Sequence, residues 1–355
     1  MISLNDLRQK IDSLDDKLLT LLEERMGIVK EVGRLKNSKG GAIYRPEREK
    51  EIIDRLSKSS KHLNRQAIEA IFLEVFAISR NLELPERVAY LGPEGSYTHQ
   101  AAESRFGGVS EYMPMSTITN VFKTVTSRRA KYAVVPIENN IEGIVGETLD
   151  NLAQTPLSIV SEVVMPIHHA FVTTSDKTSD IKKIYSKDIA FNQCKNFLSD
   201  YNLESAEKIP VESTAKAAKI AASEKGSAAI CSHIAAKLYG VPTLFENIED
   251  SEENKTRFVI LSDFKNQRSK NDKTSIFAKI AHSKEAGALF NFLKDFNELE
   301  INMNKIESRP IKESRDFSFW FFIEFDGHID DENIKELFKR RGDEIKWLGS
   351  YTKEA

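Results

Sequence analysis

The sequence has 355 residues, which is enough for about two or three domains of ordinary size. Its 51 lysines and arginines nearly balance its 54 aspartates and glutamates, and a net charge of -3 argues against the broad basic surface of a general nucleic-acid binder. Charged residues make up 30% and hydrophobic residues 40% of the chain, as in folded domains and unlike disordered ones.

The composition also argues against a membrane span and against secretion. No window approaches about 18 uninterrupted apolar residues. Residues 1–10 are charged and lack the apolar core of a signal peptide, so we expect a cytoplasmic protein. The cysteines are Cys194 and Cys231, with no Cys-x-x-Cys pair, so we expect small buried thiols and no disulfide framework or metal site.

Three changes of texture divide the sequence, and they predict domains at 1–85, 87–263 and 273–352. Residues 1–84 have helical patterning throughout. The middle segment alternates helices with strands predicted at 88–91, 132–136, 158–165, 169–173, 228–231 and 257–261. This alternation predicts a largely parallel sheet covered on both faces. Residues 274–351 follow the order strand, helix, strand, strand, helix, strand of an α+β ferredoxin-like unit.

The first helix is expected to begin after Ser3, because Ser3 and Asp6 have the spacing of a capping box. Its apolar residues follow a heptad pattern through Leu4, Leu7, Ile11, Leu14, Leu18, Leu21, Ile28, Val32 and Leu35. About 34 residues make a helix about 50 Å long, which the two shorter helices that follow cannot cover. We therefore expect a second copy of the chain to cover this seam in an intertwined helical dimer.

Arg25 stands in this apolar seam, where a charge is costly unless it is paired. One interpretation is a salt bridge between helices. The other is an anion-binding arginine in a helical cavity that suits a small dicarboxylate with a hydroxyl. The further cations are then Arg8, Lys36 and Arg48, and the acceptors are Glu49, Ser79 and Glu83. The pattern alone leaves both interpretations open.

Residues 4–84 resemble the all-helical chorismate mutases. The matching motifs are Leu7-Arg8-x-x-Ile11-Asp12-x-Leu14-Asp15, Arg25, Val32-x-x-x-Lys36, Arg48-Glu49 and Ser79-Arg80-x-x-Glu83. The resemblance implies that Arg25, and Arg8 from the partner chain, each bind a carboxylate of chorismate. It also implies that Lys36 and Glu83 hydrogen-bond the ether oxygen. Glu49 would take the substrate hydroxyl, supported by Arg48 and Ser79.

The implied reaction is a unimolecular Claisen rearrangement, which uses neither a nucleophile nor a cofactor. Its catalysis would come from holding a compact conformer and from fixed donors at the ether oxygen. Two positions depart from the family's pattern. Arg45 replaces a frequent Asp and is left out of the site, and Glu83 replaces Gln. Because an ionised Glu cannot donate a hydrogen bond, Glu83 would have to be protonated.

The turn Gly92-Pro-Glu94-Gly95-Ser96 lies between a predicted strand and a predicted helix. Its backbone N–H groups and the helix N-terminus could hold an anion, with Glu94 and Ser96 as substrate contacts. Taken alone, the segment is better explained as a plain tight turn.

Residues 88–262 resemble prephenate dehydratases. The motifs are Val135-Pro136-Ile137-Glu138-Asn139, Glu142-Gly143, Glu212-Ser213-Thr214-Ala215, Tyr239-Gly240 and Asn254-x-Thr256-Arg257-Phe258. The resemblance implies two α/β lobes similar to periplasmic binding proteins, with the site in the cleft between them. It implies that Thr256 donates a hydrogen bond or proton to the departing hydroxyl. Asn139, Ser213, Thr214 and Phe258 would contact substrate, and Arg257 is either a carboxylate clamp or a structural ion pair.

Several middle-segment positions depart from this pattern or suggest other chemistry. Asn140, Ile144 and Ser186-Lys187-Asp188 differ from the residues usual in the family. The pair His168-His169 begins a strand, and we expect a packing or hydrogen-bonding role because no third metal ligand is evident.

The last segment resembles the ACT regulatory domain attached to dehydratases. The motifs are Gly287-Ala288-Leu289 at a helix start and Glu307-Ser308-Arg309-Pro310 at a strand end. Without the resemblance they are a close-packing glycine and a strand-terminating proline. The resemblance implies L-phenylalanine as effector, bound between paired domains. Phe290 and Asn304 replace frequent Val and Thr.

The motif sets in this order resemble the bifunctional chorismate mutase–prephenate dehydratases under phenylalanine feedback. The implied partners are chorismate, prephenate and L-phenylalanine, with a homodimer or higher homo-oligomer and with no cofactor, metal, nucleic acid or membrane. One alternative is an enzyme with a single activity and one degenerate domain. Another is a non-catalytic amino-acid sensor, against which the charges Arg8, Arg25, Lys36 and Glu49 argue.

Overall fold

The computed structural model describes residues 3–37, 44–83, 86–251, 253–269, 271–280, 285–310 and 319–353, apart from the side chains of Lys36, Asn37 and Glu83. It divides into two compact units, each described by itself. The helical unit comprises Met1–Glu86 with Phe106–Glu111, and the α/β unit comprises Arg87–Arg105 with Tyr112–Ala355. No helix in the described part of the chain has the length and hydropathy needed to span a membrane.

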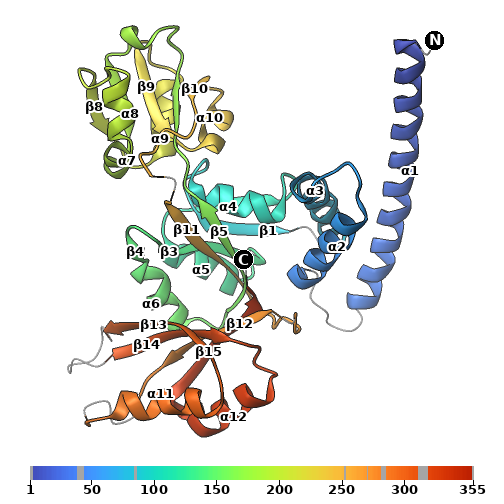
Figure 1. Ribbon diagram of the computed structural model, residues 1–355, viewed down its shortest axis with the longest axis vertical. Helices are drawn as coiled ribbons and strands as arrows, with labels where there is room; N and C mark the ends of the chain where they lie inside the picture. The colour runs from blue at the N-terminus through green and yellow to red at the C-terminus, as the bar shows by residue number, and fades with distance from the viewer. Residues whose placement is uncertain are drawn as a thin grey trace. The chain divides into compact units, whose positions relative to one another are not determined.

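The helical unit contains α1 (Leu4–Asn37), α2 (Pro46–Ser59) and α3 (Arg65–Glu83) (Figure 1). The predicted capping box is confirmed, because Ser3 N donates to Asp6 Oδ2 at 2.8 Å and Asp6 N donates to Ser3 Oγ at 3.1 Å. Pro46 occupies the first turn of α2, where its missing N–H costs nothing. The small core of α2 and α3 is built from Ile53, Ile68 and Phe76.

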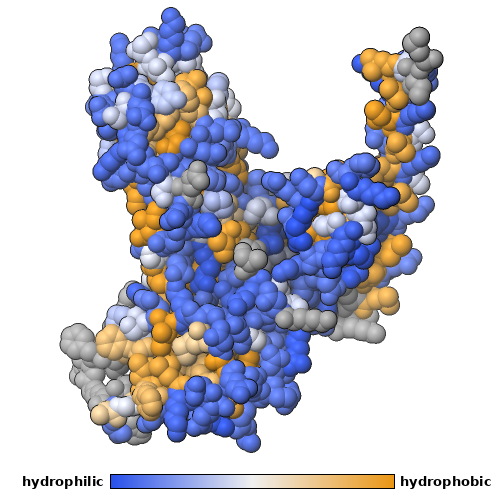
Figure 2. All heavy atoms as spheres, in the orientation of Figure 1, coloured by the Kyte–Doolittle hydropathy of each residue, from blue (hydrophilic) through white to orange (hydrophobic). Residues whose placement is uncertain are grey.

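The apolar seam of α1 is exposed in the single chain. Its side chains have exposed fractions between 40% and 66%: Leu4, Leu7, Ile11, Leu14, Leu18, Leu21, Ile28, Val32 and Leu35. Figure 2 shows hydrophobic residues along the length of this helix. Burying one such side chain contributes about 1.5–3 kcal/mol, so the seam is a large uncovered apolar surface.

The first lobe of the α/β unit has a sheet with strand order β2-β1-β3-β11-β5, to which β4 adds by pairing with β3. The strands are β1 (Arg87–Leu91), β2 (Glu111–Met115), β3 (Tyr132–Asn139), β4 (Gly143–Ile144), β5 (Ser158–Pro166) and β11 (Lys255–Ser262). Its helices are α4 (Tyr97–Phe106), α5 (Ile118–Thr126) and α6 (Gly146–Gln154). Strand β11 is antiparallel to both neighbours, β3 and β5.

The second lobe has a sheet with strand order β10-β6-β9-β7-β8. Its strands are β6 (Ala170–Thr173), β7 (Lys183–Ser186), β8 (Glu207–Pro210), β9 (Ser227–Cys231) and β10 (Thr243–Phe245). Its helices are η1 (Thr178–Asp180), α7 (Asp188–Gln193), α8 (Lys195–Asp200), α9 (Thr214–Ala221) and α10 (His233–Tyr239).

The prediction of a largely parallel sheet was wrong in part. Strand pairs β1–β3, β7–β8 and β7–β9 are parallel, but β3–β11, β5–β11, β6–β9 and β6–β10 are antiparallel. The physical reason is that the chain passes from the first lobe to the second after β5 and returns as β11, which inserts beside β5 in the opposite direction. The predicted strands also omitted β2, β4, β7, β8 and β10, which are short or largely polar.

The C-terminal region, residues 271–353, has the predicted order of strands and helices. It comprises β12 (Asp272–Ala278), α11 (Ala288–Glu298), β13 (Met303–Pro310), β14 (Phe319–Asp326), α12 (Glu332–Arg341), η2 (Gly342–Glu344) and β15 (Ile345–Thr352). The sheet order is β13-β14-β12-β15, and the pairs β12–β14, β12–β15 and β13–β14 are antiparallel.

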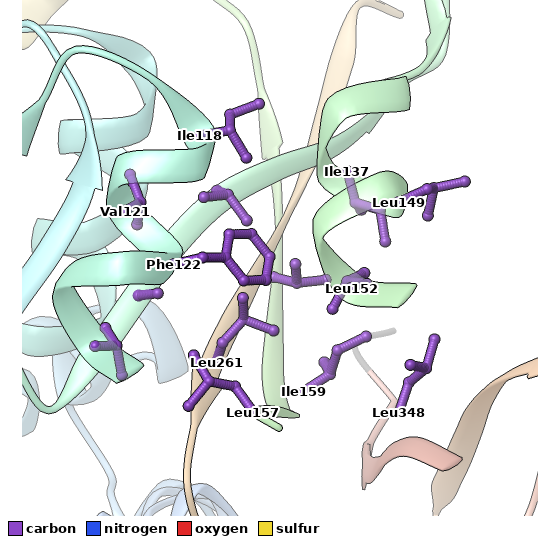
Figure 3. Close-up of a cluster of buried hydrophobic side chains, with 14 of the residues drawn as sticks. Ile118, Val121, Phe122, Ile137, Leu149, Leu152, Leu157, Ile159, Leu261 and Leu348 are labelled. Atoms are coloured by element: carbon purple, nitrogen blue, oxygen red, sulfur yellow. The ribbon is translucent and has the colours of Figure 1, made fainter. Parts of the chain in front are cut away.

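The C-terminal region shares one hydrophobic core with the first lobe. Phe277, Phe322 and Leu348 pack in the same cluster as residues of α5, α6 and the first-lobe sheet, part of which is drawn in Figure 3. Gly349 has φ +151°, and a Cβ there would lie 2.2 Å from the carbonyl oxygen of Ile159. Only glycine therefore permits this approach of β15 to β5.

Candidate active sites

Arg25 lies against Ser79 in the helical unit. Its Nη1 donates to Ser79 Oγ at 2.5 Å, and its guanidinium lies over the Phe76 ring at 5.9 Å. Burial lowers the pKa of Arg25, while the nearby Glu49 charge raises it. Among the side chains that the structure describes, the direct polar partner of Arg25 is thus a neutral hydroxyl and not a carboxylate. A cation in this state can still bind an anion.

Glu49 is held by Arg80, which is 3% exposed. The Arg80 guanidinium contacts the Glu49 carboxylate through Nη1 and donates from Nε to Glu86 Oε2 at 2.9 Å. Its charge lies 5.4 Å from the centre of the Tyr44 ring and 5.7 Å from that of Phe106. Burial lowers the pKa of Arg80, but Glu49 and Glu86 outweigh burial and raise it, so Arg80 is a permanent cation behind Glu49.

The turn at Gly95 brings helix N-termini from both lobes together. Gly95 has φ +82°, and a Cβ there would lie 3.3 Å from Ala215 of α9 and from Ala235 of α10. Ser232 Oγ donates to the Gly95 carbonyl at 2.7 Å, and Gly95 N donates to His99 Nδ1 at 3.2 Å. The N-termini of α4 and α9 therefore approach each other, and their partial positive charges suit an anion.

Thr256 is fixed by Asn139 across the β3–β11 pair. Asn139 Nδ2 donates to Thr256 Oγ1 at 2.9 Å and to Asn254 Oδ1 at 2.8 Å. Asn139 Oδ1 accepts from the N–H groups of Ile141 and Glu142, each at 2.9 Å. Because the Thr256 oxygen accepts from an amide, its own proton is directed elsewhere and is available to a substrate oxygen.

Arg257 faces a buried cluster of charges. Its Nη1 and Nη2 bind the two oxygens of Glu324 at 2.6 and 3.2 Å. Glu138 lies 3.6 Å and Glu162 3.8 Å from the guanidinium, and Lys273 pairs with Glu162 at 2.6 Å. Of the two interpretations of Arg257, these contacts support the structural ion pair, because the Glu324 carboxylate already binds both terminal nitrogens of the guanidinium group.

The histidine pair lies where the chain enters the second lobe and has a hydrogen-bonding role there. His169 bonds Tyr97 Oη at 2.7 Å and Gln193 Oε1 at 2.8 Å. Cys194 and Cys231 are free and fully buried, and burial raises the pKa of Cys231 to about 12 and that of Cys194 further. In the described part of the chain, no group of three or more His, Cys, Asp or Glu residues could hold a metal ion.

Two family models match the chain in tandem. Residues 7–84 match chorismate mutase type II, and residues 88–266 match prephenate dehydratase. A relative from Aquifex aeolicus, a bifunctional chorismate mutase/prephenate dehydratase, is 38% identical over 99% of both chains. One with the same name from Escherichia coli K12 is 32% identical over 98% of this chain and 96% of its own. The chain belongs to the bifunctional chorismate mutase/prephenate dehydratase family.

Solved structures support the dehydratase part of this assignment. A prephenate dehydratase from Arthrobacter aurescens in complex with L-Phe matches with TM-score 0.69 and 29% identity, covering 75% of this chain and 90% of that one. A prephenate dehydratase from Staphylococcus aureus matches with TM-score 0.61 and 27% identity, covering 75% and 100% of the two chains. The chain is thus an enzyme of this family with a helical mutase region and a two-lobed α/β dehydratase region.

The structure brings together part of the predicted mutase site. Arg25 and Ser79 are in contact, with the Glu49 charge close enough to act on Arg25. Arg48 is 62% exposed in its side chain and pairs with Glu51 at 3.0 Å, and Arg8 is exposed on α1. Arg8 and Arg25 lie about 25 Å apart along the helix, so one chain does not place both in one site. The predictions for Lys36 and Glu83 fall on side chains outside the described residues.

The predicted dehydratase residues fall into contrasting environments. Ser96 and Ser213 use their hydroxyls at the N-termini of α4 and α9, accepting from His99 N at 3.3 Å and Lys216 N at 3.0 Å. Thr214 is 9% exposed, and Glu94 is an exposed carboxylate. Phe258 is 1% exposed within the sheet, so in this structure it is a core residue and does not line a cleft.

The residues predicted to bind the effector form two separate groups. Gly287 has φ +86° at the start of α11, with Ala288 and Leu289 following. A surface pocket beside them is lined by Ala288 but by none of residues 307–310. On β13, Glu307 and Arg309 are partly buried while Ser308 and Pro310 are exposed. Within one copy of the chain, residues 287–289 and residues 307–310 therefore do not line that pocket together.

The ion pairs of Arg80 were not predicted from the sequence, although Arg80 stands in one of the quoted motifs. Arg80 follows Phe76 by four residues, so it lies on the same buried face of α3. A charged residue at a position of the apolar face was the signal that could have identified a buried ion pair.

Replacing Arg80 with Met is expected to lower the unfolding free energy of the helical unit by about 3–5 kcal/mol, since the buried Glu86 and the partly buried Glu49 lose their cation. Urea unfolding followed by circular dichroism measures this effect. Arg48→Met is the matched control, because its ion pair with Glu51 is exposed and contributes less than about 1 kcal/mol. Equal losses in the two variants would contradict the role of Arg80.

Replacing Arg257 with Met should destabilise the dehydratase region by about 3–5 kcal/mol near neutral pH. Burial raises the pKa of Glu324, but Arg257, Lys273 and hydrogen bonds from Arg257 and Ser275 outweigh it and leave the pKa below its ordinary value of 4.5. The stabilisation is therefore present above that value and is lost as the pH falls through the lower folded pKa. The two proteins should converge in stability in acid, as thermal unfolding across pH would measure. A difference independent of pH would contradict the charge mechanism.

Proposed function

We propose that this chain performs both family reactions. The helical unit converts chorismate to prephenate, and the two-lobed region converts prephenate to phenylpyruvate in L-phenylalanine biosynthesis. The observation that carries the proposal is the tandem match to both family models, with named bifunctional relatives over nearly the full length of the chain. The two reactions are consecutive, because the product of the first is the substrate of the second.

In the mutase reaction, Arg25 binds one substrate carboxylate, and Arg8 of a second copy binds the other. Glu49 accepts the substrate hydroxyl, with Arg80 holding its carboxylate in place. Lys36 and a protonated Glu83 donate to the ether oxygen, with Arg48 and Ser79 in support. The rearrangement breaks one C–O bond and forms one C–C bond within a single molecule, so orientation and fixed charges supply the catalysis.

In the dehydratase reaction, Thr256 donates to the departing hydroxyl while the ring loses CO₂. The electron pair of the C–CO₂ bond enters the ring as the C–OH bond breaks, and the ring becomes aromatic. Asn139 supports this role because it occupies the acceptor side of the Thr256 hydroxyl. The helix N-termini near Ser96, Ser213 and Thr214 attract the carboxylates of prephenate. Glu94 borders this site.

A second copy of the chain completes the mutase site. The exposed seam of α1 supports an intertwined helical dimer, since it needs a cover, and the distance along α1 from Arg8 to Arg25 requires a second chain. The dimer, or a higher oligomer built from it, therefore forms part of this proposal. The free thiols Cys194 and Cys231 fit the reducing cytoplasm as the place of action.

The C-terminal region acts as an ACT regulatory domain that binds L-phenylalanine and inhibits the dehydratase. The βαββαβ order supports this assignment, as does the L-Phe complex of the Arthrobacter relative. The effector binds between paired copies, where Gly287, Ala288 and Leu289 of one meet Glu307, Ser308, Arg309 and Pro310 of the other. With residues 1–85, 87–263 and 273–352 as mutase, dehydratase and regulatory domains, the chain has three domains.

The departures from the family pattern do not favour a degenerate dehydratase. Asn140 donates to the Glu253 carbonyl at 2.5 Å and accepts from Lys255 N at 2.8 Å, so it ties the loop after β3 to β11. Ser186 Oγ donates to the Ile230 carbonyl at 2.8 Å inside the second lobe. Asn140 therefore supports the strand that carries Thr256 and leaves its hydroxyl unchanged, while Ser186 is part of the buried interior of the second lobe.

To test the proposal, chorismate is added to the purified full-length protein. The loss of chorismate and the formation of phenylpyruvate are then measured with and without L-phenylalanine. Loss of chorismate with formation of phenylpyruvate that L-phenylalanine suppresses supports the proposal. Accumulation of prephenate alone would leave only the mutase. Persistence of chorismate would overturn the mutase assignment, and binding of L-phenylalanine without either reaction would favour a sensor.

A further inference from the structure

Strand β13 directs alternate side chains toward the first lobe. Lys305, Glu307 and Arg309 are partly buried, while the residues between them are exposed. Figure 1 places β13 beside α6 of the first lobe. Two of the inward side chains carry positive charges to that lobe, and each has an acidic partner there.

The first of these contacts is between Lys305 and Glu138. Lys305 Nζ contacts the Glu138 carboxylate, and Glu138 is the residue immediately before Asn139 on β3. Glu138 also lies 3.6 Å from Arg257. Lys305 and Glu138 lie at the partly exposed edge of a cluster of charges that also contains Glu162, Glu324, Arg257 and Lys273. Removing Lys305 leaves this cluster with an excess negative charge next to Asn139.

The second contact is between Arg309 and the start of α6. Arg309 Nη2 lies 3.1 Å from Asp150 Oδ1. Its guanidinium also covers Gly146, the first residue of α6, where a Cβ would lie 2.5–2.9 Å from the guanidinium atoms. Gly146 has no positive φ, so its lack of a side chain serves this close approach and not a special backbone conformation.

The two contacts bracket the segment 139–145, with Glu138 before it and Gly146 after it. This segment carries Asn139, which donates to Thr256 and accepts from the N–H groups of Ile141 and Glu142. The position of the Thr256 hydroxyl therefore depends on a segment whose two ends are held by β13.

We propose that Lys305 and Arg309 are positioning residues of the dehydratase, which hold the Asn139 segment in the geometry that Thr256 requires. The C-terminal region is then part of the dehydratase machinery even without an effector. A displacement of β13 would reach Thr256 through these two ion pairs. The inference rests on the proposed dehydratase function and on the roles of Asn139 and Thr256 within it.

The experiment compares Lys305→Met, Lys305→Arg and the exposed control Lys339→Met in the full-length protein. The control pairs on α12 with Glu336 at 3.9 Å, and its side chain is 81% exposed. Lys305→Met should lower dehydratase kcat about ten- to hundredfold with little change in KM, because the reacting groups are displaced while binding groups remain. Lys305→Arg should recover most of the loss, and mutase activity in the same chain should stay unchanged.

A second pair of variants tests Arg309 without relying on its removal alone. Gly146→Ala inserts a methyl group where the guanidinium lies and displaces the end of the Arg309 side chain, so it should lower dehydratase kcat in the same direction as Arg309→Met but by less. The double variant should be no worse than Arg309→Met alone, since both changes disrupt one contact. Full dehydratase kcat in Lys305→Met and Arg309→Met would overturn the inference, as would parallel loss of both activities. A wild-type protein without dehydratase activity would instead overturn the proposed function.

Discussion

Thr256→Val should lower dehydratase kcat/KM by about 10²–10⁴-fold, the range for loss of a positioned proton donor. Valine keeps the β-branched shape that suits strand β11 but lacks the hydroxyl. The fold should be retained, because Asn139 Nδ2 keeps its bonds to Asn254 Oδ1 at 2.8 Å and to the Lys255 carbonyl at 3.2 Å. The measurement is the rate of phenylpyruvate formation from prephenate.

Thr256→Ser is the matched control, because it keeps the hydroxyl that accepts from Asn139 and donates to substrate. It should retain activity within about tenfold of wild type. Mutase activity in the same chain should be unaffected in both variants. A Thr256→Val protein as active as Thr256→Ser would exclude the hydroxyl from the chemistry.

Arg25→Met should lower mutase kcat/KM by about 10²–10³-fold, since a fixed charge that meets a substrate carboxylate is lost. Methionine can fill the space over the Phe76 ring, where the guanidinium lies at 5.9 Å, so packing is largely kept. The measurement is the loss of chorismate by purified full-length protein, and dehydratase activity on prephenate reports whether the rest of the chain is intact.

Arg25→Lys separates charge from geometry. Lysine keeps the positive charge but not the planar fork that binds a carboxylate with two hydrogen bonds, so its activity should lie between those of wild type and Arg25→Met. If Arg25→Met retained mutase activity, the alternative of a salt bridge between helices in the assembled protein would be favoured.

Local patterns predicted much of the fold. The capping box at Ser3 and Asp6 and the order of strands and helices in the C-terminal region follow from neighbouring residues, and the structure has both. Residue type and spacing also predicted Arg25 and Ser79 as candidate site residues, and the structure places these two side chains in contact. Local patterns succeed here because capping and amphipathic periodicity act over a few residues.

Other features could not be predicted because they depend on distant partners. The insertion of β11 between β3 and β5 joins segments far apart in the chain, and it reverses the expected parallel pairing. Arg257 follows Thr256 directly, yet strand alternation sends it to Glu324 of β14. The residues next to Arg257 in the sequence do not indicate that Glu324 is its partner. The sequence therefore did not distinguish a substrate-binding arginine from a structural ion pair, and the position of β14 does.

The sequence by itself determined which chemistry the chain can carry: its amphipathic periods, its turn residues and the motifs of two enzyme families are local or ordered along the chain. Tertiary structure alone decided which charges neutralise one another. It placed Arg80 against Glu49 and Glu86 and paired Arg257 with Glu324. It also brought the Asn139 amide within hydrogen-bonding distance of the Thr256 hydroxyl. The physical reason is that the cost of burying a charge depends on what lies within a few ångströms in space, and sequence separation does not specify that distance.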